Sequence, residues 1–145
     1  MKKATDKTQR QKPRDEYNNL VKQVEIVNIC LVGAKVDNFD YSYFPSEAIV
    51  KWRERAEYQN KEHAIDVIHH YYVTISDDET KKSKAKVSVV FNVTYSSGIP
   101  MNDEFFTIFK THNLKLNTWP YFREFVHNIA LRMGWPPFIA PTYVS

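Results

Sequence analysis

The stretch Asn117 to Pro141 reads NTWPYFREFVHNIALRMGWPPFIAP, and it decides the fold. Asn117 or Thr118 is suited to cap the start of a helix, and Pro120 fits the first turn, where a missing N–H is not needed. Gly134 can adopt the left-handed conformation that ends many helices, and two prolines soon after it prevent continuation. The stretch therefore predicts a helix with defined ends.

Apolar residues form one stripe along this helix. They recur with the period of an α-helix, at Phe122, Phe125, Val126, Ile129, Ala130 and Met133. Trp119, Tyr121 and Leu131 lie off the stripe. Two interpretations stay open: a core helix with scattered surface apolar groups, or a helix that packs on a sheet and offers its other flank to a partner.

The chain before the helix contains four stretches with strand patterns. Val21 to Val36 places Val24, Ile26, Asn28, Cys30 and Val32 on one face and Val27, Ile29 and Leu31 on the other. Such a strand is either covered on both sides or exposes one face to an apolar ligand. Ala48 to Tyr58 alternates as a strand, although WRERAEYQNK would also suit a helix. Ile65 to Ile75 and residues 87–95 alternate clearly around a polar hairpin tip at 77–86.

A short helix follows these strands. Asn102 or Asp103 can cap it, and it carries Phe105, Phe106, Ile108 and Phe109. Four strands followed by helices predict an α+β fold: a four-stranded antiparallel sheet with C-terminal helices packed on one face.

Composition predicts two regions. Residues 1–16 hold six of the 20 basic and three of the 17 acidic side chains, which leaves 14 of each in residues 17–145. We expect 1–16 to be a disordered basic tail, with little prospect of nucleic-acid binding, and 17–145 to be a single neutral domain. The single cysteine, Cys30, and the lack of an apolar signal or spanning segment predict a cytoplasmic protein.

No motif for catalysis is found. The sequence lacks nucleophile-elbow, zinc-protease, paired-cysteine and glycine-rich phosphate patterns. His69 and His70 are neighbours on a strand, so their side chains point to opposite faces and cannot hold one metal ion. We therefore expect neither an enzyme nor a cofactor.

The end of the chain resembles the SecB family of export chaperones. In that family a helix begins F-P-Y-A-R-E, closes with R-G-G-F-P and runs into L-A-P-V-N-F. The matching positions here are Pro120, Tyr121, Arg123, Glu124, Arg132, Gly134, Pro136, Ala140 and Pro141. The match covers about 25 of the 145 residues, and the rest agrees in the order of elements.

The resemblance implies a dimer or tetramer that holds unfolded or nascent client polypeptides, without nucleotide, in grooves between sheet and helices. Aromatic and aliphatic side chains would line such a groove and bury apolar area without reading sequence. Aromatic residues are unusually frequent in the connection 37–46, since loops lie on the surface. The candidate residues for binding polypeptide are Phe39, Tyr41, Tyr43, Phe44, Val50, Trp52, Tyr121 and Leu131.

Two departures from the family bear on function. The sequence stops soon after its Ala-Pro segment, where the family continues into a further helix, and residues 17–145 are neutral where the family is acidic. Docking to the export motor is therefore not expected, and a dedicated client such as an antitoxin is as consistent as general export. The alternative is a structural or assembly protein whose aromatic surfaces form contacts between subunits.

Overall fold

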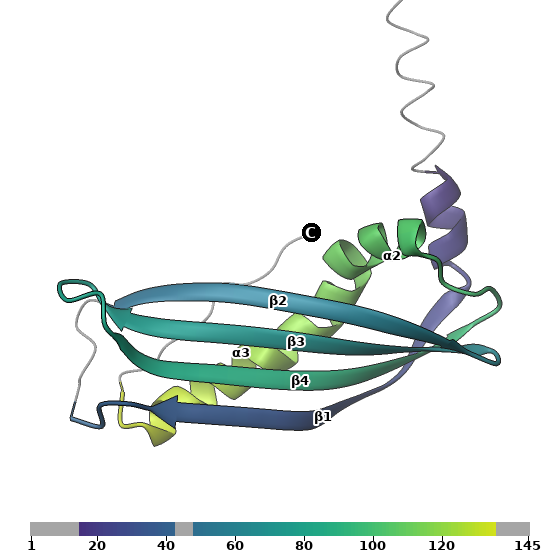
Figure 1. Cartoon of the computed structure of the whole chain (residues 1–145). Coiled ribbons are helices and arrows are strands. Elements are labelled where there is room, and N and C mark those ends of the chain that lie inside the picture. The colour runs from purple at the N-terminus through teal and green to yellow at the C-terminus, as the bar shows by residue number, and fades with distance from the viewer. Residues whose placement is uncertain (1–14, 43–47, 136–145) are drawn as a thin grey trace, which may run out of the picture.

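The fold is a four-stranded sheet with helices on one face (Figure 1). The computed structural model describes residues 15–42 and 48–135. Their strands and C-terminal helical segments follow in the order β1 (Val24–Asn38), β2 (Ala48–Lys61), β3 (Ala64–Asp77), β4 (Ser83–Ser97), α2 (Asp103–Phe109), the π-helical turn η1 (Lys110–Leu114) and α3 (Lys115–Arg132). All strand pairs are antiparallel and the sheet order is β1-β4-β3-β2. The predicted α+β architecture is confirmed, and Ala48–Lys61 is a strand rather than a helix.

The two central strands owe their place to a strict alternation of apolar residues. In β3 and β4 every second side chain is buried, including Val67, Val73, Val89 and Val93, while the residues between them are half-buried, apart from exposed Lys86. Strands with this pattern bury one face and leave the other to water or a partner. The buried face is the one that α2 and α3 cover (Figure 1).

The outer strand β1 departs from its predicted faces. The pairing with β4 shifts between Ile26 and Asn28 and again between Leu31 and Gly33. Val27 and Val32 therefore sit at bulges, where an extra residue breaks the alternation. The sequence predicted that Ile26, Asn28 and Val32 share one face, and this prediction is wrong. Ile26 pairs with buried Tyr95 and Leu31 with buried Phe91, so Ile26 and Leu31 lie on the helix-covered face.

The start of α3 also differs from the sequence prediction. The helix begins at Lys115, directly after η1, and no side chain caps it. Asn117 instead accepts a hydrogen bond from the Tyr95 hydroxyl at 2.8 Å, and Thr118 is fully buried. Neither residue caps the helix, because both side chains contact the sheet, and Pro120 lies inside the helix rather than in its first turn.

The predicted stripe and the predicted end of α3 are confirmed. Phe122, Val126 and Ala130 are buried, and the other stripe residues, Phe125, Ile129 and Met133, are half-buried against the core. Gly134 has a φ of 74°, and the Trp135 N–H donates to the Ala130 carbonyl at 3.0 Å. This hydrogen bond is typical of a helix that ends in a left-handed glycine.

Residues 15–21 form a short helix that the sequence pattern did not predict. The Tyr17 ring packs against Phe105 of α2 with ring centroids 5.4 Å apart, and the Tyr17 hydroxyl donates to Asn113. Val21 therefore belongs to this helix and not to β1. As predicted, Asn102 caps α2, accepting from the Phe105 N–H at 2.8 Å. Residues 1–14 lie outside the described residues.

Candidate functional site

A hollow lies beside the N-terminal half of α3, at the border with β2. It has a volume of about 310 Å³ and is lined by Trp52, Arg53, Glu54, Tyr71, Lys115 and Trp119. This volume lies at the lower end of the range of small-ligand sites, about 300–1,000 Å³. It is large enough for one or two apolar side chains of an extended peptide.

Aromatic rings build the wall of this hollow. Trp52 lies 5.5 Å from Trp119 and 5.4 Å from Phe122, measured between ring centroids. Tyr71 stacks on Phe122 at 4.2 Å with an interplanar angle of 8°. Phe122 and Tyr71 are buried in the core, whereas Trp52 is 36 % exposed. These contacting rings therefore extend the aromatic core outward to the wall of the hollow.

Charged groups form the rim. The Glu54 carboxylate accepts from Nε2 of His69 at 3.1 Å and pairs with the Lys115 ammonium at 3.3 Å. Burial alone would raise the pKa of Glu54, but the His69 hydrogen bond and the Lys115 charge together outweigh it, so the pKa lies below its usual value. Glu54 is therefore ionised at neutral pH and holds Lys115 beside Trp119.

Thr118 joins α3 to the sheet next to the hollow. Its buried hydroxyl donates to the Leu114 carbonyl at 3.1 Å and lies 3.0 Å from Nδ1 of His69 and 2.7 Å from the Tyr71 hydroxyl. This places one helix hydroxyl between two buried side chains of β3. The network fixes how α3 sits on the sheet and, with it, the width of the hollow.

The opposite flank of α3 is also apolar. Tyr121 is 51 % exposed, with its ring 6.4 Å from that of Phe91 on β4. Beyond Phe91, on the same face, Leu31 of β1 is 51 % exposed. The bulge residues Val27 and Val32 add further exposed apolar area on β1.

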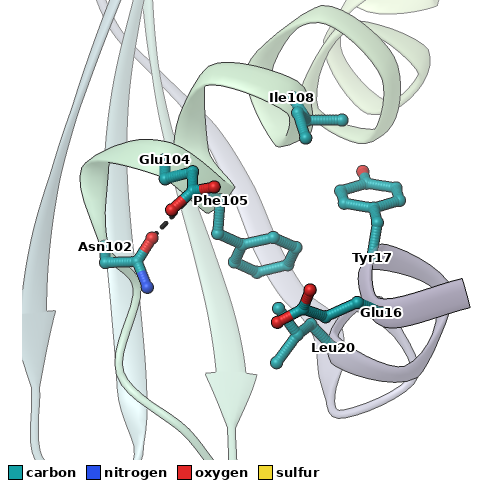
Figure 2. Close-up of a pocket in the computed structure, with 7 residues that line it drawn as sticks. All are labelled: Glu16, Tyr17, Leu20, Asn102, Glu104, Phe105 and Ile108. Carbon is teal, nitrogen blue, oxygen red and sulfur yellow. Dashed lines mark hydrogen bonds between the residues drawn. The ribbon is translucent and has the colours of Figure 1, made fainter. Parts of the chain in front are cut away.

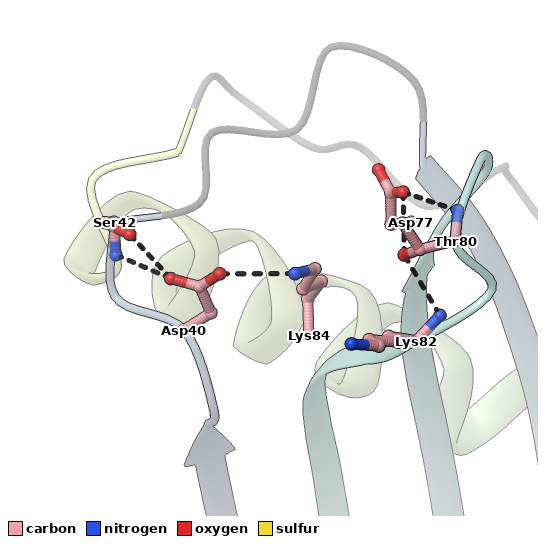
Figure 3. A network of polar contacts seen from close by, with 6 residues as sticks. All are labelled: Asp40, Ser42, Asp77, Thr80, Lys82 and Lys84. Atoms are coloured by element: carbon pink, nitrogen blue, oxygen red, sulfur yellow. Dashed lines mark hydrogen bonds and ion pairs between the residues drawn. The ribbon is translucent and has the colours of Figure 1, made fainter.

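Polar contacts of Asp40 anchor the turn that follows β1 (Figure 3). Asp40 accepts from the Ser42 hydroxyl at 2.7 Å and from the Lys84 ammonium at 3.2 Å, and both contacts lower the pKa of its carboxyl. The Phe39 N–H donates to the Lys84 carbonyl at 2.9 Å. With the backbone held in this way, Phe39 is 57 % and Tyr41 91 % exposed.

The six predicted residues that the structure describes do not gather in one place. Trp52 lines the hollow, and Val50, two residues earlier on the same strand, packs partly buried against the core. Tyr121 lies on the other flank, whereas Leu131 is 48 % exposed near the end of α3. Phe39 and Tyr41 follow β1, and Tyr43 and Phe44 lie outside the described residues.

Sequence reasoning missed several residues of the hollow. Trp119, Tyr71, Glu54 and Lys115 all line it. Trp119 was noted off the helix stripe, and its position three residues before Phe122 could have placed it beside the buried face. Glu54 interrupts the apolar alternation of β2, which is the signal that a charged group faces the helix side.

A second, smaller hollow of about 110 Å³ lies between the helix of residues 15–21 and α2 (Figure 2). Tyr17, Leu20, Phe105 and Ile108 supply its apolar part, and Glu16, Asn102 and Glu104 its polar part. None of the predicted binding residues lines it. Its contacts explain instead how residues 15–21 attach to the domain.

Within the described ranges, no three His, Cys, Asp or Glu side chains are grouped as metal ligands would be. None of the helices in the same part of the chain is long and apolar enough to cross a membrane.

Comparison with known proteins identifies the fold. A SecB-like chaperone of Mycobacterium tuberculosis, solved in complex with a ChAD peptide from the HigA1 antitoxin, superposes with a TM-score of 0.76. The superposition covers 87 % of this chain and 94 % of that chain, at 14 % sequence identity. The chain has the SecB-like fold. No family model and no curated protein sequence matches it.

The SecB-like fold confirms the architecture that the Asn117 to Pro141 stretch implied. At 14 % identity the likeness is one of fold.

Replacing Thr118 with valine should destabilise the protein by about 2–3 kcal/mol, because the substitution keeps the shape but leaves buried hydrogen-bonding groups of His69 and Tyr71 without a partner. Urea unfolding at fixed protein concentration measures the change.

Thr107→Val is the matched control. Thr107 makes the same kind of hydrogen bond to the carbonyl four residues earlier, at 2.8 Å, but is exposed. Its substitution should change stability by less than about 0.5 kcal/mol. Equal losses in the two variants would show that the contacts of Thr118 with the sheet contribute nothing.

Proposed function

We propose that this protein is a holding chaperone, which binds non-native or nascent polypeptide segments without ATP on the apolar surfaces beside α3. The observation that carries this proposal is the aromatic hollow at Trp52 and Trp119, continuous with the core and open to solvent. The proposed action is reversible binding, and no covalent step belongs to it.

An extended segment fits the position of the hollow. β2 is an outer strand of the described sheet: one of its edges pairs with β3, and no strand of the sheet pairs with the other. The outer edge of β2 can add one strand, through hydrogen bonds that do not depend on sequence. Alternate side chains of that strand would then point toward the hollow beside Trp52.

Burial of apolar area would supply the affinity. Each square ångström removed from water contributes about 25 cal/mol, whatever the residue. Glu54 and Lys115 on the rim already pair with each other, so an apolar segment could bind beside them without breaking a contact with water that either charge needs. The surface therefore suits many apolar sequences rather than one motif.

We infer a dedicated client, such as an antitoxin, in the reducing environment of the cytoplasm. The SecB-like chaperone with the same fold was solved with a peptide from an antitoxin, which supports this class of partner. Residues 17–145 are neutral in sum and so lack the net negative charge that docking to the export motor would use. General export of many clients is the broader version of the same proposal.

The proposal predicts that the purified protein suppresses aggregation of a chemically unfolded client at stoichiometric ratio in the absence of ATP. Trp52→Ala and Tyr121→Ala should each weaken binding of a labelled apolar client peptide by about tenfold, since exposed aromatic anchors commonly contribute about 1.4 kcal/mol or more. Fluorescence anisotropy and light scattering measure the two effects.

Ile108→Ala is the matched control, because Ile108 is 39 % exposed but lines the smaller hollow. It should leave both readouts unchanged. Thermal unfolding of each variant shows whether it is folded at the assay temperature. Full activity in both aromatic variants would place client binding elsewhere.

A second candidate is a structural or assembly protein whose apolar surfaces join subunits. Exposed Val27, Leu31 and Val32 on the outer strand β1 favour this role. Pairing of β1 with a second copy would cover these side chains and extend the sheet. A dimer or tetramer is compatible with chaperone action as well, so oligomerisation alone does not separate the two functions.

Light scattering and a peptide titration together separate the two candidates. We expect a mass of at least twice the 17.1 kDa of one chain. Leu31→Lys should lower this mass, because a lysine buried at the contact would oppose pairing of β1. A stable oligomer that binds no unfolded client would favour the assembly role. A monomer that binds client would exclude pairing through β1.

A further inference from the structure

The sheet has a second face, opposite to α2 and α3, which neither function uses. Two rows of directly paired residues cross this face at one end. The first row is Lys35, Ser88, Tyr72 and Arg53, and the second is Asp37, Lys86, Thr74 and Lys51. Residues paired directly across an antiparallel sheet point to the same side. The eight side chains, here called the cationic rows, therefore share one surface.

Positive charge dominates the cationic rows. They hold Lys35, Lys51, Arg53 and Lys86 against one carboxylate, Asp37, and all four cations are exposed. The Lys35 ammonium lies 3.6 Å from Asp37, an exposed pair that contributes about 0–1 kcal/mol and is easily exchanged. A shallow hollow of about 210 Å³ runs between these side chains, lined among others by Lys35, Arg53, Tyr72 and Lys86.

The other end of the same face holds charges of both signs. Glu25, Glu57 and Asp66 point to this side, but Arg55 lies there 3.9 Å from Glu57, and Lys61 pairs with Asp66. Unbalanced positive charge on this face is therefore concentrated at the cationic rows. The neutral total of residues 17–145 hides this excess, because it sums charges over the whole domain.

The one aromatic residue of the cationic rows, Tyr72, is already engaged by its neighbours. The Arg53 guanidinium lies 4.5 Å from the centre of the Tyr72 ring, and Tyr72 stacks with His70 at 6.1 Å. Nη2 of Arg55 lies 3.4 Å from Nε2 of His70. Proteins that bind single-stranded nucleic acid need free aromatic faces for the bases. Because Arg53 already occupies the Tyr72 ring, the rows favour a ligand that supplies charge without bases.

The spacing of the cations matches carboxylates on an extended chain. Neighbouring strands are about 4.8 Å apart, so Lys86 and Lys51, two strands apart, are separated by about 10 Å and Lys35 and Arg53 by about 14 Å. Alternate side chains of an extended peptide recur every 6.8 Å or so. Lysine and arginine side chains are long enough to make up the difference between the spacing of the cations on the sheet and that of the carboxylates on the peptide.

We propose that the cationic rows bind an acidic polypeptide segment of a partner protein, on the face of the sheet opposite to the client surface. This inference does not rest on the chaperone proposal, because the two surfaces lie on opposite faces of the sheet. They share Arg53 of the outer strand β2, whereas Lys51 and Lys86 lie only on the cationic side. Charge complementarity identifies the partner's chemistry: a run of aspartate or glutamate in extended conformation.

The test is binding of a fluorescein-labelled deca-glutamate peptide to the full chain, followed by anisotropy. The affinity should fall steeply between about 50 mM and about 300 mM KCl, as screening of exposed charges requires. The double variant Lys51→Glu with Lys86→Glu should weaken binding by about tenfold or more, because two attractive contacts become repulsive.

The control double variant, Lys22→Glu with Arg132→Glu, changes the net charge equally at exposed positions outside the rows. It should weaken binding less than twofold or so, since screening removes distant charges. Binding of an apolar client peptide should be unchanged in both double variants, so failure here is separable from failure of the chaperone proposal.

Three results would overturn the proposal. The first is no binding of deca-glutamate to the unaltered chain at low salt, and the second is an equal loss of affinity in both double variants. The third is that an oligothymidylate binds more tightly than deca-glutamate and that the substitutions in the cationic rows abolish its binding. The last result would assign the rows to nucleic acid instead.

Discussion

The structure depends on the packing of one helix against a sheet that is too large for it. Four strands about 4.8 Å apart and about 14 residues long make a face of roughly 19 by 46 Å. An 18-residue helix is about 27 Å long and about 10 Å wide. α3 crosses the strands obliquely (Figure 1), and apolar side chains of β1 and β2 stay partly exposed on either side of it. Trp119 and Phe122 cover Trp52 only in part, and Leu31 stays half exposed, because one helix is too narrow to cover the full width of the sheet.

The position of α3 is fixed by polar contacts as much as by apolar ones. Phe122 supplies the apolar contact with Tyr71, and Thr118 joins the same tyrosine to His69. His69 in turn reaches Glu54 on the rim of the hollow. A buried network whose members all have partners favours one arrangement over its neighbours. The exposed apolar surface can therefore persist without the helix sliding over to cover it.

The sequence allowed the elements to be predicted, but not their mutual placement. Alternation in β3 and β4 and the stripe at Phe122, Val126 and Ala130 are local patterns, so they could be read directly. The bulges at Val27 and Val32 arise from pairing with β4, and the early start of α3 arises from the π-helical turn at Lys110–Leu114. The cationic rows need the register of all four strands. Each of these features is set by tertiary contacts that periodicity does not contain.

The central claim is that the flanks of α3 bind non-native polypeptide. A benzophenone side chain placed in turn at Trp52, Tyr121 and Tyr72 tests it most directly, because all three positions are aromatic and Tyr72 lies on the opposite face. Each variant is irradiated with a denatured client that has no acidic run. Cross-links from positions 52 and 121, with few from position 72, are the predicted result. Equal yields from all three positions, or cross-links from position 72 alone, would contradict the claim.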